Sequence, residues 1–560
     1  MDPVAVPVEG AHRQRSPARD TASGGRGWLA ATLTAQVLLS LALWRHLAAQ
    51  LNPDAVAYGR AAELWVAGRP RLALNATWGA LSPLLAVPGL LLGADPVDAL
   101  RGSQIACGLL LTLGTNALLQ CLGVAPALRI VLVLAAALHT SYAATAVIAS
   151  DVSYTAVFVW LCWTLLTPRT RVGGCPRPLL AGMLAALAYV ARPAGLGMGL
   201  TMLAATEWWH ARTDRRAGAG RRRTAVLAGC GWAAIGVPWL LALGLHYGHL
   251  PLAHSAGLVH AAVGPHAGHP WNLPSFTRLH RPPDGRVTTW EDPSLLDHAT
   301  LDWSPFASPA AWRHQRDLAA GNARAIIRAL MLIDGVGLAL VALVLVPVLG
   351  MYLPRPPAGW REPWLLLAPA LHVLALTPLH VEARYLWPVV PIGLGALGAL
   401  GTRVLAAGAR GTGQVGLARA AAVGLVVLPP LWHHATMAAA FLMMPARDER
   451  AIADEWAGRL RAAGAVGPTV SWSSYPEKAL DPEGLYLAWR TGQPWLANLS
   501  TDGRDLPDAV ALGARVLVAK SEPGAALPEW LARAPWSPLL ATDVRGRTLR
   551  DGRYVLLVRR

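Results

Sequence analysis

Long apolar runs alternate with short polar segments along most of this chain. Because the hydrocarbon core of a bilayer is about 30 Å thick and needs about 20 helical residues to cross, runs of that order predict transmembrane helices. The pattern therefore predicts a polytopic α-helical membrane protein with about 11 transmembrane helices, at 28–50, 101–122, 128–149, 152–167, 179–192, 194–207, 225–247, 326–350, 364–379, 385–402 and 420–443.

Two stretches need a choice about whether they cross the membrane. Segment 80–94 has only 15 residues and contains Pro83 and Pro88, so we expect it to lie in the interface, as part of the first outer loop. Segment 179–207 is split at "ARPAG" into two short spans, since a single crossing would invert every later loop.

Arginines in the connecting loops give the expected orientation. With these spans, the Arg-rich loops, including "RTDRRAGAGRRR" at 212–223, fall on the cytoplasmic side, as the positive-inside rule requires. Residues 1–27 then form a disordered cytoplasmic leader to an uncleaved anchor, and 28–443 form the transmembrane domain. The outer loops are 51–100, a turn at 150–151 and 248–325. We expect a multi-pass protein of the plasma membrane.

The last segment of the chain, 444–560, changes character. "ARDERAIADEWAGRLRAAG" has the pattern of an amphipathic helix, "TVSWSS" and "ARVLVAK" are typical of buried strands, and "DGRYVLLVRR" is expected to end a hairpin. The sequence thus predicts a small extracytoplasmic C-terminal α/β domain.

Composition agrees with a membrane protein and narrows the possible partners. Apolar residues make up 54% and charged residues 15% of the chain, and the net charge of +16 comes almost entirely from arginines in short loops. That placement serves orientation in a lipid bilayer, so we expect no nucleic acid partner. The five cysteines show no paired spacing, so neither a zinc site nor a disulfide framework is expected.

Histidines are frequent in and beside the long outer loop. Their spacing fits no metalloprotease or zinc pattern, which favours an ordinary polar loop and no metal site; they are His246, His249, His254, His260, His266 and His269.

Two acidic residues stand at predicted outer ends of helices. Asp54 begins an amphipathic stretch after the first span, and Asp151 opens a later span. Each could simply cap its helix. The alternative is a general base at the membrane surface, where partial desolvation raises carboxylate basicity and a lipid substrate can approach sideways.

Two arginines also lie at outer ends of spans, Arg192 in "AYVARPAGL" and Arg384 in "LHVEARYLWPVVP". Interfacial arginines often only snorkel to the membrane surface. The alternative is that they bind a phosphate through paired hydrogen bonds. Glu382 could instead neutralise Arg384.

These segments occur in an order that resembles the GT-C membrane glycosyltransferases, which include protein O-mannosyltransferases and the aminoarabinose transferase acting on lipid A. The resemblance is carried by "PDAVAYGRAAELWVAGR", "ALRGSQIACGLLLTLGTNALL", "SDVSYTAVFVWLCWTLL", "AGMLAALAYVARPAGL" and "EARYLWPVVPIGLGALG". It implies a polyprenyl-phosphate sugar donor, an outward-facing site and inverting transfer to a hydroxyl of a glycan, lipid or protein. By motif it implies Asp54 and Asp151 as the catalytic acids and Arg384, with Arg192, as the phosphate-binding residues.

One position departs from several relatives, which carry a second acid directly after the first. Here that position is Ala55, which weakens assignment as a protein mannosyltransferase and any metal site built on adjacent carboxylates. No cofactor is expected. A transporter or flippase of lipid-linked glycans is the alternative class, although we find neither repeated halves nor ionisable residues placed for mid-membrane transport. A non-catalytic scaffold that displays the C-terminal domain is the third.

Overall fold

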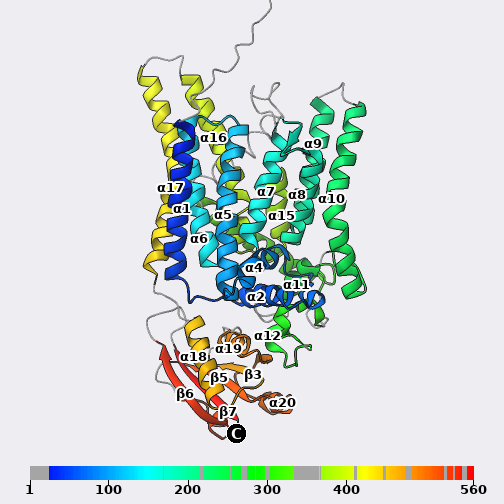
Figure 1. Ribbon diagram of the computed structural model, residues 1–560, viewed down its shortest axis with the longest axis vertical. Helices are drawn as coiled ribbons and strands as arrows, with labels where there is room; N and C mark the ends of the chain where they lie inside the picture. The colour runs from blue at the N-terminus through cyan, green and yellow to red at the C-terminus, as the bar shows by residue number, and fades with distance from the viewer. Residues whose placement is uncertain are drawn as a thin grey trace, which may run out of the picture.

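The chain folds into a helical body with a smaller mixed sheet at one end (Figure 1). The computed structural model describes residues 24–167, 169–213, 218–252, 254–265, 274–283, 285–296, 303–332, 365, 367–408, 413–444, 449–474, 482–522, 526–533, 536–544 and 552–559. The predicted leader, up to residue 23, and 333–350 of one predicted span lie outside the described residues.

Helices coincide with ten of the eleven apolar runs. They are α1 (Gly24–His46), α5 (Pro96–Cys121), α6 (Pro126–Ala146), α7 (Asp151–Leu166), α8 (Arg177–Ala191), α9 (Gly195–Thr213), α10 (Gly218–Tyr247), α15 (Leu367–Leu376), α16 (Val389–Gly408) and α17 (Gly413–Met443). Among the described residues, five helices are long and apolar enough to cross a membrane by length and composition. The polytopic helical fold is as predicted, while the count of 11 spans stays a prediction.

One further helix, between α10 and α15, differs from expectation. α13 (Pro309–Leu332) begins well before the apolar run predicted from residue 326, because its first turns are polar and carry no membrane signal. The preceding loop also contains α11 (His254–Ala262), α12 (Pro274–Thr277), η1 (Thr289–Glu291) and η2 (Pro293–Leu295). The described residues of the predicted outer loop 248–325 therefore include four short helices and the first part of α13.

The first loop folds as three short helices, α2 (Pro53–Val66), α3 (Pro70–Ala73) and α4 (Leu81–Leu91). α2 starts with proline at its first position and ends before Gly68, whose φ of +68° suits a helix terminus. α4 has 11 residues, or about 17 Å of helix, which is too short to cross a bilayer. α2 and α4 lie at the end of the helical body that faces the sheet (Figure 1).

The predicted break at "ARPAG" is confirmed between α8 and α9. Arg192 there is extended, with φ −158° and ψ 135°, as a residue before proline favours. Pro193 cannot donate the next helical hydrogen bond, so the chain turns back and begins α9.

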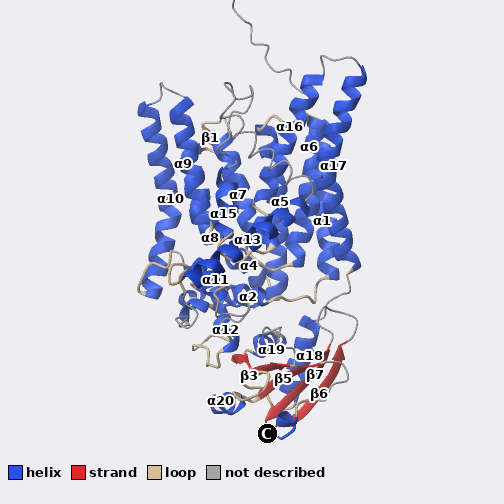
Figure 2. Ribbon diagram, turned by 180° about the vertical axis from the view of Figure 1, so that it is seen from behind, coloured by secondary structure: helices blue, strands red, loops and turns tan. Residues whose placement is uncertain are grey.

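The C-terminal part contains a five-stranded sheet of order β4-β3-β5-β7-β6, shown in red in Figure 2. β3 (Thr469–Ser473) pairs in parallel with β4 (Trp495–Asn498) and β5 (Val516–Ser521), while β7 (Gly552–Arg559) pairs antiparallel with β5 and β6 (Trp536–Val544). The predicted strands and hairpin are thus present. Helices α18 (Glu449–Ala462), α19 (Glu483–Thr491), α20 (Leu506–Ala511) and α21 (Glu529–Arg533) accompany the sheet.

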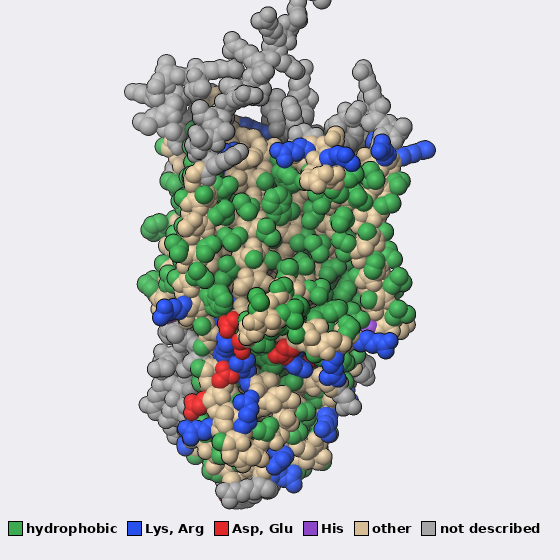
Figure 3. All heavy atoms as spheres, viewed as in Figure 1, with side chains coloured by type: hydrophobic (Ala, Val, Ile, Leu, Met, Phe, Trp, Pro, Cys, Tyr) green, Lys and Arg blue, Asp and Glu red, His purple; other side chains and the backbone are tan. Residues whose placement is uncertain are grey.

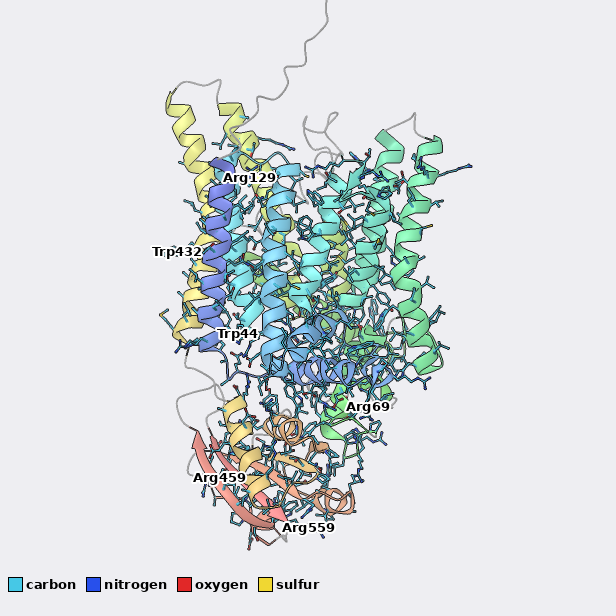
Figure 4. All side chains as sticks on the ribbon, in the orientation of Figure 1. Trp44, Arg69, Arg129, Trp432, Arg459 and Arg559 are labelled. Atoms are coloured by element: carbon cyan, nitrogen blue, oxygen red, sulfur yellow. The ribbon has the colours of Figure 1, made fainter. Side chains whose placement is uncertain are left out.

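The surface has the zones of a membrane protein. A broad band of hydrophobic side chains lies between two zones of Lys and Arg (Figure 3). Arg129 marks the end away from the sheet, where α1 begins and α9 approaches α10, whereas Arg459 and Arg559 lie on the C-terminal part (Figure 4). The arginine distribution assigns these two ends to opposite sides of the membrane. Which end faces the cytoplasm stays a prediction.

Candidate active site

A cavity of about 370 Å³ lies where α2, the start of α7, the α8–α9 break and α11 converge. Its walls include all four residues singled out from the sequence, namely Asp54, Asp151, Arg192 and Arg384. Four segments far apart in the chain therefore bring these side chains to one place.

The two carboxylates do not act as helix caps. Asn52 is the N-cap of α2 and Ser150 that of α7, and neither helix start has a side-chain capping hydrogen bond. Asp54 and Asp151 instead occupy the first turns, where helical N–H groups favour negative charge, and they are only 5% and 2% exposed.

Arg384 connects the acids. It lies in η5 (Ala383–Leu386), where its Nη1 donates to Asp54 Oδ2 at 2.7 Å and its Nε donates to Glu382 Oε2 at 2.7 Å. The same Nε lies 4.0 Å from Asp151 Oδ2. Its guanidinium is thus held in the protein rather than extended to the membrane surface, and Glu382 is indeed one of its partners.

Arg192 completes the group from the α8–α9 break. Its Nη1 forms an ion pair with Asp151 Oδ1. Its guanidinium lies over the ring of Tyr385, 4.4 Å from the centroid, a cation–π arrangement. Arg192 also points into the cavity, so snorkelling does not explain its position.

Burial and charge act differently on the acids in this group. Burial raises the pKa of Asp54, and the nearby Arg384 only partly opposes that effect. Burial would also raise the pKa of Glu382, but the hydrogen bond from His380 and the charge of Arg384 lower it to about 2. Burial disfavours the charged form of Arg384 and so lowers its pKa. The negative charges of Asp54 and Glu382 outweigh this effect and raise the pKa of Arg384 well above its usual value. Glu382 is therefore a fixed anion, whereas Asp54 has enhanced proton affinity.

Aromatic residues form another part of the cavity wall, and the sequence reasoning missed it. Tyr58 meets Trp78 edge-on with ring centroids 5.7 Å apart, and Trp78 meets Trp290 edge-on at 4.8 Å. The Tyr58 hydroxyl donates to Ser150 Oγ at 2.9 Å, which joins α2 to the residue before Asp151. Tyr58 could have been found, because it follows Asp54 by one helical turn. Trp290 lies in the short helix η1, which has no periodicity to single it out.

The segment around Trp290 is held by buried polar contacts. The Trp78 indole donates to the Trp290 carbonyl at 2.9 Å, and Asn75 donates to the Glu291 carbonyl. Asp292, which is 0% exposed, accepts a hydrogen bond from Tyr247 at 2.9 Å. These contacts join the first and the long outer loops into one wall.

Of the histidines singled out in and beside the long outer loop, His266 and His269 lie outside the described residues, and His249 and His260 contact different partners. His249 contacts the carbonyl of Tyr247, while His260 contacts Gln315 and stacks on Trp303. Within the described ranges, no group of three His, Cys, Asp or Glu residues is placed to hold a metal ion.

Comparisons with known proteins give a match in fold and none in sequence. No protein-family model and no curated protein matches this chain. Two crystal structures of ArnT from Cupriavidus metallidurans are similar to it, one bound to undecaprenyl phosphate with a TM-score of 0.51 and one in the apo state with 0.52. Each is 14% identical to this chain in sequence. The matched region covers 95% of this chain and 98% of the ArnT chain. The chain therefore shares the ArnT fold, which confirms at the level of fold the resemblance to the aminoarabinose transferase.

Proposed function

We propose that this protein is a membrane glycosyltransferase that moves a sugar from a polyprenyl-phosphate donor to an acceptor hydroxyl on the outer face of the membrane. The observation that carries the proposal is the hydrogen bond between Arg384 and the buried Asp54 in a cavity shared with Asp151 and Arg192. The fold adds support, because one of the similar ArnT structures contains undecaprenyl phosphate.

The residues suit a single displacement with inversion. Asp54 accepts the proton of the acceptor hydroxyl while its oxygen attacks the anomeric carbon. The bond from that carbon to the phosphate oxygen breaks, and the electron pair leaves with the polyprenyl phosphate. Arg384 and Arg192 stabilise the departing anion through hydrogen bonds to its oxygens. Attack from the side opposite the phosphate inverts the anomeric configuration.

Donor binding would also prepare the base. Arg384 Nη1 donates to Asp54 here, and a phosphate oxygen is a competing acceptor for the same N–H group. When the phosphate takes this bond, Asp54 loses the interaction that lowers its pKa and becomes a stronger base. Glu382 holds the Nε of Arg384 throughout, so the guanidinium stays in the cavity.

Asp151 has a supporting role in this scheme. Its ion pair with Arg192 orients that guanidinium, and its 4.0 Å separation from Arg384 Nε lets it balance the second cation. It is the second acid of the site and does not itself accept the acceptor proton.

The test is an assay of the purified protein with a panel of polyprenyl-phosphate sugars and candidate acceptors, measuring release of free polyprenyl phosphate. We expect release by the wild type, none by Asp54→Asn and normal release by Asp317→Asn, whose side chain is 69% exposed. If no donor releases phosphate while proteoliposomes move a labelled donor across the bilayer, the protein is a transporter and the proposal is wrong.

A further inference from the structure

We propose that Trp489, in the C-terminal part of the chain, is a positioning residue for the reaction: it supports α2 on a side of the helix turned away from the cavity and thereby fixes Asp54. The inference rests on the proposed role of Asp54 as the base. Trp489 itself does not line the cavity.

The geometry of α2 places it between the cavity and α19. Asp54 and Tyr58 line the cavity and are one helical turn apart. Gly59 follows Asp54 by five residues, which is about 140° around the helix. A Cβ added to Gly59 would lie 2.5 Å from Cζ2 and 2.8 Å from Cη2 of Trp489. The indole therefore packs directly on the α2 backbone, an approach that only glycine permits.

Trp489 is enclosed by the packing around it. It is 5% exposed and belongs to one hydrophobic cluster that joins the two parts of the molecule. The cluster includes Ala55, Val56, Tyr58 and Ala62 of α2 together with Leu485, Tyr486, Ala488 and Trp495. Because the interior is densely packed, the indole cannot yield to a larger residue without moving one of the two helices.

Ion pairs fix α18 and α19 against the helical body on the same side. Arg490 Nη1 donates to Asp95 Oδ2 at 2.8 Å, and Asp95 is the N-cap of α5. Arg450 donates to both carboxylate oxygens of Asp98 at 3.0 Å. Arg490, next to Trp489, thus forms an ion pair with the helical body. This contact fixes the position of the indole along α2.

The same C-terminal segment also contacts the aromatic wall. The Trp495 amide donates to the Val287 carbonyl at 2.7 Å, three residues before Trp290. Two walls of the cavity, α2 and the segment of Trp290, therefore depend on α19 and β4. Disturbing the α19 contact should displace Asp54, while Arg384 and Arg192 stay in place because they lie on other elements.

Gly59→Ala tests the inference by inserting a methyl group between α2 and the indole. Since a shift of about 1 Å can cost a hundredfold in rate, we expect kcat to fall about tenfold to a hundredfold. The donor KM should change less than about threefold, because the phosphate-binding arginines are not moved. The matched control is Gly102→Ala in α5, where an added Cβ has no atom within 4 Å.

A second variant separates positioning from general destabilisation. Trp489→Phe lacks the outer ring atoms that a Cβ at Gly59 would meet. The double variant Gly59→Ala/Trp489→Phe should therefore recover most of the lost kcat. Thermal unfolding of each variant gives its folded fraction, and kcat is expressed per folded molecule. A Gly59→Ala protein with wild-type kcat would overturn the inference, and so would a double variant as slow as the single one. Failure of the proposed function is distinguishable, because the wild type would then release no polyprenyl phosphate.

Discussion

Asp54→Asn should have two opposite effects, loss of turnover and tighter binding of polyprenyl phosphate. The substitution keeps the size of the side chain and removes its charge. Turnover should fall about a hundredfold to ten-thousandfold, the usual contribution of a positioned general base. The asparagine amide oxygen can still accept the hydrogen bond from Arg384, so folding should be little affected.

The gain in affinity follows from the 2.7 Å hydrogen bond between Arg384 and Asp54. A bound phosphate must displace this charge-assisted bond. In the wild type both partners of this bond are ionised, which places it in the upper part of the range of about 1.5 to 3 kcal/mol for bonds to charged groups. In the variant only Arg384 is ionised, so the bond keeps its charged donor but loses the attraction of the carboxylate. The asparagine bond should therefore be about 1 to 2 kcal/mol easier to replace, which corresponds to a Kd about fivefold to thirtyfold lower.

The assay is titration of a short-chain fluorescent polyprenyl phosphate into wild type, Asp54→Asn and the exposed control Asp317→Asn in one detergent. The reasoning fails if the Asp54→Asn protein binds the lipid as the wild type does, because the phosphate would then not compete for Arg384. Near-normal turnover of the same variant would show that Asp54 is not the base.

Three further outcomes are expected. Arg384→Lys should lower donor kcat/KM about tenfold to a hundredfold in initial-rate measurements, since lysine cannot donate two parallel bonds; if Arg192→Lys is impaired and Arg384→Lys is not, the phosphate site belongs to Arg192. In a cysteine-free background, Arg459→Cys should react with an impermeant thiol reagent in intact cells and Arg222→Cys should not; the reverse result inverts the topology. Activity should fall with acid as Asp54 is protonated, with the acid limb of kcat/KM above the ordinary carboxyl value of 3.8, because burial raises its pKa; a limb at or below that value contradicts the argument.

Local signals were enough to predict much of the helical body. Apolar length marks most of the helices, and the proline after Arg192 marks the α8–α9 break in the sequence itself. The four candidate site residues could be selected because ionisable groups at the ends of apolar spans are conspicuous. α13 begins before the predicted apolar run because its first turns are polar and mostly exposed, so they carry no membrane signal.

The contacts that complete the site could not be predicted in this way. Trp290 reaches the cavity from the short helix η1 within the long loop. Its position depends on Trp78, and on Tyr247 through the neighbouring Asp292, and both partners are distant in sequence. The approach of Trp489 to Gly59 joins residues roughly 430 positions apart, and no pattern within either helix indicates the other. For the same reason the pairing of Asp54 with Arg384 emerges only from the fold, although each residue alone was a candidate.

The hydrophobic cluster shared by α2 and α19 has a consequence for how the protein is made. α2 leaves the ribosome long before Trp489 and Trp495, which lie more than roughly 400 positions later in the chain. The side of α2 at Gly59 therefore lacks the Trp489 indole until α19 has been made and has reached the same side of the membrane, although α4 and α5 already pack on α2. A chain that stalls before α19 would expose that apolar surface and leave Asp54 without its support, so full activity would appear only once α19 has packed against α2.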